Sequence, residues 1–119
     1  MSRSEIESLL GDLNSLVLQG KSMEAFEKYY HNDVIMQENN EAPTISKEAN
    51  RARELEFYSK IQEFRSASVK GVGIGDDLSF VIWHYDYTHA EWGDKNYTQV
   101  SIQQWKDGSI IYEQFIYPN

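Results

Sequence analysis

The sequence contains no cysteine, which excludes disulfides, thiolate nucleophiles and zinc sites built on thiolates. It is also poor in positive charge, because 11 Lys and Arg residues stand against 19 Asp and Glu residues and give a net charge of -8. No basic run offsets this charge locally, so binding to nucleic acid or to an anionic membrane is not expected.

Long apolar runs are missing as well. Residues 1–5, Met-Ser-Arg-Ser-Glu, lead into a helical pattern broken by charges, with neither the apolar segment of a secretion signal nor a span that could cross a membrane. We therefore expect a cytoplasmic protein. The 119 residues show no repeat, linker or low-complexity segment, which predicts one domain over residues 1–119 with a single core.

Three helical patterns occupy the first half of the chain. A capping box at residues 4–7 opens a helix whose apolar spacing ends at Gly20. A short helix follows from Ser22, and the longest one, capped by Ser46, is predicted over residues 47–64. The charged side of this last helix is interpreted as a solvated face: Lys47, Glu48, Arg51, Arg53, Glu54 and Glu56.

Strand patterns follow the second and third helices. They are predicted at Val34–Gln37 and Ala67–Ile74, where residues are β-branched or the glycines fit a strand that bends. From Leu78 to Tyr117 the chain is predicted to form three antiparallel strands of a curled sheet. These patterns predict an α+β fold in which helices close the sheet into a pocket.

The turns of this meander fix which side chains share a face. A two-residue turn with Gly93 at its first position sets His84 opposite Gln103 and Asp86 opposite Ser101. One face is then predicted to be mixed: Ile82, His84, Asp86, Ser101, Gln103, Trp105, Ile111, Glu113, Phe115 and Tyr117. The other face is predicted to be apolar and aromatic, with Trp83, Tyr85, Tyr87 and Tyr112 among its residues.

Two interpretations of these faces are open. In the first, both faces are covered, the mixed one by helices that enclose a pocket and the aromatic one by a second copy of the chain. In the second, the aromatic face packs on the helices and the mixed face meets water, which requires neither a pocket nor a dimer. The strands alone do not decide between them.

Two local stretches carry a resemblance. The first is Gly20-Lys21-Ser22-Met23-Glu24-Ala25-Phe26 with the following Tyr30-His31-Asn32-Asp33-Val34, and the second is Trp105-Lys106-Asp107-Gly108-Ser109-Ile110 with Glu113-Gln114-Phe115. With the order of the elements, they resemble the SnoaL-like branch of the nuclear transport factor 2-like superfamily. The resemblance implies three N-terminal helices on a strongly curved, mainly antiparallel sheet that forms a cone-shaped pocket, and a homodimer through the convex sheet face. It therefore favours the interpretation in which both faces are covered.

Ketosteroid isomerase belongs to the superfamily that the chain resembles. By this resemblance Glu38, five residues after Asp33, matches the general base, and Gln103 matches the neutral acid that holds the oxyanion. Leu13 stands where that enzyme has a second oxyanion donor, a tyrosine. One role is kept, one is replaced by a weaker donor and one is lost, so the same reaction on a steroid is not expected.

The residues predicted to face the pocket could carry acid/base chemistry. An apolar pocket raises the pKa of a carboxyl group toward neutrality, which makes Glu38 and Glu113 candidate catalytic residues beside His84. The remaining inward residues are predicted to bind ligand: Asp86, Ser101, Gln103, Trp105, Phe115 and Tyr117. Neither a metal nor a cofactor is expected, because no two histidines converge with a carboxylate.

Each candidate also has a structural interpretation. Glu113 could belong to a buried hydrogen-bond network, Glu38 could be exposed before the loop that begins at Asn39, and His84 could be an interior histidine with its hydrogen bonds satisfied. Two functions are therefore considered. One is a cofactor-free isomerase, cyclase or dehydratase acting on a small apolar carbonyl compound, and the other is a non-catalytic module for ligand binding, dimerisation or interaction with a partner.

Overall fold

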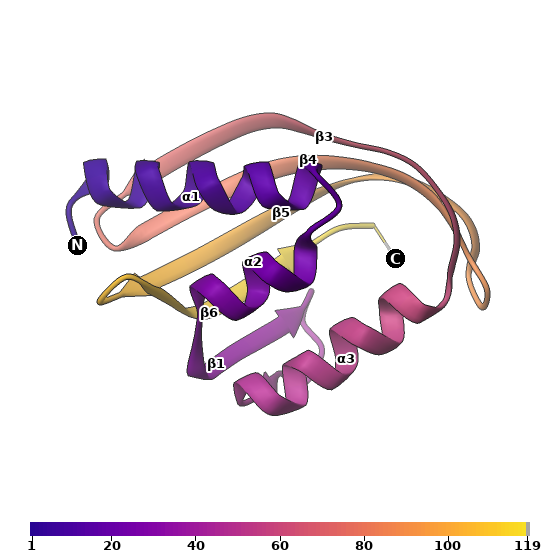
Figure 1. Cartoon of the computed structure of the whole chain (residues 1–119), viewed down its shortest axis with the longest axis horizontal. Helices are drawn as coiled ribbons and strands as arrows, with labels where there is room; N and C mark the ends of the chain where they lie inside the picture. The colour runs from indigo at the N-terminus through magenta and orange to yellow at the C-terminus, as the bar shows by residue number, and fades with distance from the viewer. Residues whose placement is uncertain (119) are drawn as a thin grey trace.

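The computed structural model describes residues 1–118 and shows three helices and six strands (Figure 1). In chain order these are α1 (Arg3–Leu18), α2 (Ser22–Tyr29), β1 (Tyr30–Glu38), β2 (Thr44–Ile45), α3 (Lys47–Ser59), β3 (Ile61–Gly75), β4 (Leu78–His89), β5 (Gly93–Lys106) and β6 (Ser109–Ile116). The α+β class and the three N-terminal helices are confirmed. None of the helices in residues 1–118 is long and apolar enough to span a membrane.

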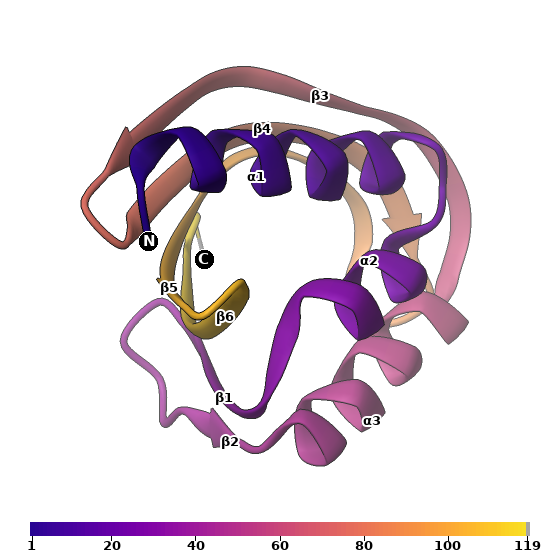
Figure 2. The ribbon, with the colours of Figure 1, turned by 60° about the vertical axis from the view of Figure 1, so that its left-hand side comes forward.

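One sheet contains all six strands, in the order β2-β1-β6-β5-β4-β3. Neighbouring strands are antiparallel except for β1 and β6, which run parallel. The sheet curls strongly, and α1 lies along the concave side of β3 and β4 (Figure 2). Helices α2 and α3 lie near β1, on the opposite side of the space that the sheet curls around. This is the cone-shaped arrangement that was expected.

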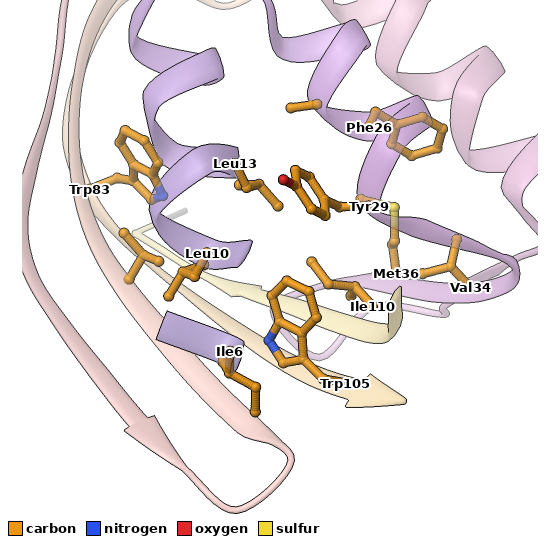
Figure 3. Close-up of a cluster of buried hydrophobic side chains, with 12 residues drawn as sticks. Ile6, Leu10, Leu13, Phe26, Tyr29, Val34, Met36, Trp83, Trp105 and Ile110 are labelled. Carbon is orange, nitrogen blue, oxygen red and sulfur yellow. The ribbon is translucent and has the colours of Figure 1, made fainter. Parts of the chain in front are cut away.

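The apolar core lies between α1, α2 and the concave side of the sheet (Figure 3). Helix α1 contributes Ile6, Leu10 and Leu13 at helical spacing, and Trp83 and Trp105 reach them from β4 and β5. The buried apolar cluster is completed by Ala25, Phe26, Tyr29, Val34, Met36, Val81 and Ile110.

The helix ends differ from those predicted. Ser2 rather than Ser4 caps α1, and its side chain and that of Glu5 form a reciprocal capping box. Ser46 caps α3 as predicted, but α3 ends at Ser59, and the apolar residues Ile61 and Phe64 begin strand β3. The prediction of one helix to residue 64 is wrong because β-branched and aromatic residues fit helical spacing and a strand equally well.

The pairing of β4 with β5 corrects the predicted faces. Residues Ala90 to Trp92 form the turn, and Gly93, with a φ of 75°, is already the first residue of β5 opposite His89. The predicted and observed registers differ by an odd number of residues, and an odd shift exchanges the two faces of a strand. His84 and Asp86 therefore lie on the outer, convex face, whereas Trp83, Tyr85 and Tyr87 face the cone.

The pairing of β5 with β6 keeps the predicted face. The sequence Lys106-Asp107-Gly108 predicts a three-residue turn, but Asp107 and Gly108 make a two-residue turn with positive φ at both positions. An irregularity between Gln104 and Trp105 then restores the face, so Gln103 pairs with Glu113 on the concave side. The faces of Ile110 and Ile111 are exchanged by this bulge, and Ile110 is the buried one.

Candidate active site

A chain of buried hydrogen bonds crosses the concave face of the sheet and ends on Glu113. The indole Nε1 of Trp105 donates to Ser79 Oγ over 2.8 Å, and this hydroxyl donates to Gln103 Oε1 over 2.7 Å. The amide Nε2 of Gln103 donates to Glu113 Oε2 over 2.9 Å, and the Tyr30 hydroxyl donates to Glu113 Oε1. The amide oxygen of Gln103 accepts the hydrogen bond from Ser79. The amide nitrogen is therefore the atom that points at Glu113.

Glu113 is almost fully withdrawn from water, with 2 % of its surface exposed. Burial raises the pKa of the Glu113 carboxyl group to about 7, against the hydrogen bonds from Tyr30 and Gln103, which favour the charged form. The carboxyl group is thus held in place by two donors and is poised near neutrality.

Glu54 is a second acid near Glu113, and it comes from the inward side of α3. Burial, and after it the charges of Glu113 and Glu38, raise the pKa of Glu54 to about 7, while Arg53 opposes the shift. Unlike Glu113, the half-buried Glu54 side chain makes no hydrogen bond or ion pair with any residue of the described range 1–118. A free carboxyl group that titrates near neutrality is the strongest sign of a reactive site in this chain.

Tyrosines surround these acids. Burial and the neighbouring acids raise the pKa of Tyr30 and of Tyr85 well above the usual value. Burial and the charge of Glu54 raise the pKa of Tyr58 to about 12 although the residue is 40 % exposed, so its hydroxyl end points inward. Within residues 1–118 the Tyr85 hydroxyl has no hydrogen-bond partner, and its ring stacks on Trp83 with centroids 5.6 Å apart. These phenols stay protonated at physiological pH and can donate hydrogen bonds.

Glu38 is the third member of this acid cluster, which we define as Glu38, Glu54 and Glu113. It is half-buried at the end of β1, where Arg53 Nη2 lies 3.3 Å from its Oε1. Burial, and after it the nearby charge of Glu38, raise the pKa of Tyr117. The Tyr117 ring packs on Tyr97, whose hydroxyl lies 2.7 Å from that of Tyr87. In residues 1–118 no three acidic or histidine side chains are arranged to hold a metal ion.

Comparison with known proteins identifies the family. The SnoaL-like domain model matches residues 4–117. The chain belongs to the SnoaL-like domain family. This result confirms the resemblance to the SnoaL-like branch of the nuclear transport factor 2-like superfamily, and the cone-shaped fold agrees with it.

Solved structures similar to this SnoaL-like domain share its fold. A protein from Mesorhizobium loti, described as a proposed SnoaL-like polyketide cyclase with carbohydrate phosphatase in brackets, has a TM-score of 0.86 at 26% identity, with 98% of this chain and 100% of that one covered. A second proposed SnoaL-like polyketide cyclase, from Jannaschia sp. CCS1, has a TM-score of 0.79 at 11% identity, with 98% and 90% covered. A protein of unknown function from Burkholderia xenovorans LB400, described as NTF-2 like, has a TM-score of 0.78 at 14% identity, with 98% and 84% covered. A search of curated proteins gave no match.

The SnoaL-like domain brings several predicted site residues together on the concave face. Gln103, Trp105 and Glu113 form the buried chain, and Ser101 accepts a hydrogen bond from Gln99 beside it. Phe115 packs against the apolar core. Glu38 and Tyr117 meet at the end of β1, as described above. Leu13 is buried in the core, so no hydroxyl from α1 reaches the acids.

Two predicted site residues are misplaced. His84 lies on the convex face, where its Nδ1 is 3.3 Å from Thr98 Oγ1. Asp86 lies on the same outer face and accepts a hydrogen bond of 2.8 Å from Arg65 Nε. The prediction that they face the pocket is wrong for both, because the β4–β5 register is shifted by an odd number of residues. The histidine on the inner face of β4 is His89, which is buried and stacked on Trp92.

The sequence interpretation missed Glu54, Tyr30, Tyr85 and Ser79. Glu54 was assigned to a solvated face, yet Asn50, Glu54, Phe57 and Tyr58 recur at helical spacing and mark an inward polar stripe on α3. This stripe was a usable signal. Ser79 carried no signal, because its role depends on the pairing of Ser79 with Gln103 across two strands.

Two hollows on the surface of the described residues lie outside the cone. One lies between α1 and β3, and the other lies on the convex face. The enclosed ligand pocket beside the acid cluster stays a prediction.

Proposed function

We propose that this SnoaL-like domain is a cofactor-free acid/base enzyme that binds a small apolar carbonyl compound between α3 and the concave face of the sheet. The observation that carries the proposal is Glu54, a half-buried carboxyl group without a protein partner whose pKa is raised to about 7. At neutral pH such a group is divided between its acid and its base form, which suits it to proton transfer.

The proposed reaction begins with removal of a proton from the carbon next to the substrate carbonyl. The Glu54 carboxylate takes this proton, and the electron pair of the broken C–H bond moves to the carbonyl oxygen to form an enolate. The free Tyr85 hydroxyl donates a hydrogen bond to the enolate oxygen. Glu54 returns the proton to a different carbon in an isomerase. In a cyclase the enolate carbon attacks a second carbonyl group, whose oxygen takes the proton from Glu54 and becomes a hydroxyl group. In a dehydratase a hydroxyl group leaves as water with the proton from Glu54.

Glu113 supports this chemistry indirectly, through its effect on Glu54. Its charge raises the pKa of Glu54, and the hydrogen bonds from Gln103 and Tyr30 keep the Glu113 carboxyl group fixed. The proposal keeps the remaining concave residues as ligand contacts: Glu38, Ser101, Trp105, Phe115 and Tyr117. It assigns no catalytic or binding role to His84 or Asp86.

The similar protein from Mesorhizobium loti favours a cyclase among the three reactions. That protein is described as a proposed polyketide cyclase, with carbohydrate phosphatase added in brackets, and is 26% identical over nearly the whole chain. A cyclase of this kind needs a base for the carbon acid and a donor for the enolate, and Glu54 and Tyr85 offer both. A cytoplasmic location is also part of the proposal.

The experiment measures proton abstraction without the natural substrate. A small apolar ketone, 1-tetralone, is incubated with the protein in D2O at neutral pD, and deuterium entering the carbon next to the carbonyl is followed by NMR. We expect exchange faster than the buffer background, reduced 100-fold or more in Glu54→Gln and roughly 10-fold in Tyr85→Phe.

Glu48→Gln is the matched control, because Glu48 lies on the exposed side of the same helix. Its exchange rate should equal that of the unaltered protein. Equal rates in Glu54→Gln and Glu48→Gln would remove Glu54 from the mechanism. Catalysis that persists in Glu54→Gln but not in Glu38→Gln would transfer the role of base to Glu38.

A homodimer through the convex face is the second candidate function, and an apolar hollow there favours it. The hollow is lined by residues of β4 and β5 without exposed polar surface, with the side chain of Ser79 turned to the other face: Leu78, Ser79, Phe80, Ile82, Val100 and Ile102. Leu78 and Phe80 are each 41 % exposed, which is costly for large apolar side chains unless a partner covers them. Trp83, Tyr85, Tyr87 and Tyr112 were predicted to lie on this face. Of these four, only Tyr112 lies there, because it pairs with the outward residue Gln104.

Light scattering coupled to size exclusion tests the dimer. We expect the unaltered protein to elute with twice the mass of one chain and Phe80→Asp to elute as a monomer with an unchanged circular-dichroism spectrum. A monomeric unaltered protein at high concentration contradicts the proposal and leaves the apolar hollow to a different partner.

A further inference from the structure

The geometry points to a second small-molecule site, between α1 and β3 and separate from the acid cluster. Helix α1 runs beside β3 for most of its length (Figures 1 and 2). A groove of about 340 Å³ lies between them and is lined by six residues: Glu7, Leu10, Gly11, Asn14, Val72 and Ile74. This volume is within the usual range for sites that hold small ligands.

Gly11 keeps this groove open. Glycine is the least favourable residue inside a helix apart from proline, so its presence in the third turn of α1 calls for a reason. Packing does not supply one, because a Cβ added at Gly11 meets no atom within 4 Å. The missing side chain instead leaves empty space over the groove.

Asn14 supplies an unpaired polar group at the wall of the groove. The residue is 8 % exposed, and its Oδ1 has no hydrogen-bond partner among the described residues. An unpaired buried amide oxygen is costly. The oxygen is closed to solvent, so a ligand in the groove reaches it once the Asn14 side chain turns toward the groove, and pairing there removes this cost. A hydroxyl group fits best, because it can donate to the amide oxygen and accept from the amide nitrogen.

Glu7 marks the other end of the groove. It is exposed, and no cation among residues 1–118 pairs with it. Glu7 and Asn14 lie seven residues apart on one helix face, which separates them by about 10 Å along the axis. Between them, Leu10, Val72 and Ile74 present apolar surface. The matching ligand is a small amino alcohol, with its hydroxyl group at Asn14, a short hydrocarbon chain in the groove and its ammonium group at Glu7.

The charge of the protein agrees with this ligand class. A net charge of -8 raises the local concentration of small cations and lowers that of anions. None of the groove residues belongs to the acid cluster, so occupancy of this site does not depend on the proposed catalysis.

The test is an NMR titration of the 15N-labelled protein with 6-amino-1-hexanol. We expect saturable shifts of the backbone amides of Gly11, Asn14, Val72 and Ile74 with millimolar affinity. Two matched ligands separate the contributions of the end groups. 1-Hexanol lacks the ammonium group and should bind several-fold more weakly, and 6-hydroxyhexanoate, which carries a carboxylate instead, should not bind measurably.

Three variants locate the ligand. Gly11→Leu fills the empty space and should abolish the shifts, Asn14→Leu should weaken binding at least tenfold, and Glu7→Gln should make the amino alcohol bind like 1-hexanol. Glu24→Gln, an exposed acid on α2, is the control and should change nothing. Saturable shifts that survive unaltered in a folded Gly11→Leu, or no shifts at the four groove residues in the unaltered protein, overturn the proposal.

Discussion

At the scale of single residues, the acid cluster reverses the usual arrangement of an α+β core. Glu113 is buried beneath the helices with both carboxyl oxygens hydrogen-bonded, while Glu54 faces it without a partner. Two nearby carboxyl groups cannot both ionise cheaply, so the second proton is lost only near neutral pH. The site is therefore held ready to exchange one proton.

This coupling predicts a pH-dependent effect of Glu54→Gln. Because the pKa of Glu54 rises from 4.5 to about 7 on folding, its contribution to stability is complete below pH 4.5 and is lost as the pH rises through 7. Glutamine stays neutral throughout. We expect Glu54→Gln to have a free energy of unfolding higher by about 1–2 kcal/mol at alkaline pH and nearly unchanged in acid, as measured by urea denaturation.

Glu48→Gln again serves as the comparison, because the stability difference it causes should be flat across the same pH range. A difference for Glu54→Gln that does not grow between acid and alkaline pH would show that the Glu54 carboxyl group titrates as it does in the unfolded chain.

A second residue-scale prediction concerns Ser79. Its hydroxyl accepts from Trp105 and donates to Gln103, so Ser79→Ala leaves a buried indole N–H and a buried amide oxygen unpaired. We expect a loss of about 2–4 kcal/mol in the free energy of unfolding, measured by urea denaturation. Ser66→Ala, on the exposed part of β3, should change stability by less than about 0.5 kcal/mol. An equal effect of both changes would mean that the buried chain contributes no stability.

At the scale of elements, α3 makes few buried contacts with the rest of the molecule. Asn50 is the only fully buried residue of α3. The Asn50 Nδ2 atom lies within hydrogen-bond distance of three carbonyl oxygens, those of Val34 at 3.3 Å, Thr44 at 3.0 Å and Ser46 at 2.9 Å. At its other end, Phe57 packs on Tyr87 and His89. The buried contacts of Asn50 and Phe57, together with the ion pairs of Arg51 with Glu27 and of Arg53 with Glu38, hold α3 and its Glu54 over the sheet.

Asn50→Asp tests this anchor. The substitution places a carboxylate oxygen where the Asn50 amide nitrogen now donates to three carbonyl oxygens. Repulsion between oxygens then replaces the hydrogen bonds. We expect a loss of about 3 kcal/mol or more and faster amide hydrogen exchange in α3 than in α1. Asn32→Asp, at an exposed position of β1, should leave both measurements nearly unchanged. Unaltered exchange in α3 would show that a different contact fixes the helix.

The elements also show how far the sequence predicts the structure. Periodicity and capping residues found all three helices, because Ser46 and the apolar stripe of α1 act locally. The register of β4 could not be obtained in this way. Gly93 favours a turn with positive φ, but it serves equally well inside a two-residue turn and at the start of a strand. The first position of Gly93 would turn His84 toward the cone, and the second turns Tyr85 toward it.

The prediction for the β5–β6 side succeeded for a related reason. The assumed turn was one residue too long, and the bulge beside Trp105 returned the alternation to the predicted face. Gln103 and Glu113 were therefore placed correctly on the concave face. Their partners Tyr30 and Ser79 depend on contacts between distant segments that local patterns do not encode.

At the scale of the whole molecule, polar groups gather inside the cone and apolar side chains cover part of its outside. Strand β4 shows both features, with buried Ser79 and His89 on the concave face and exposed Leu78 and Phe80 at its convex start. A buried polar interior is compatible with a ligand site, and an exposed apolar exterior is compatible with an interface. The two proposals thus use opposite faces of one sheet and do not compete.

The charge of the whole molecule makes the dimer testable in a second way. Each chain carries a net charge of -8, so two chains repel each other, while in the proposed dimer apolar burial on the convex face attracts them. Salt screens the repulsion, since the Debye length falls from about 30 Å at 0.01 M to about 3 Å at 1 M, and leaves apolar burial intact. We expect the dimer dissociation constant, measured by analytical ultracentrifugation, to fall as NaCl is raised, and Ile102→Glu to remain monomeric at every salt concentration. If salt instead weakened the dimer, ion pairs such as those of Arg65 on the outer edge would be holding it together, and the apolar hollow would not be the interface.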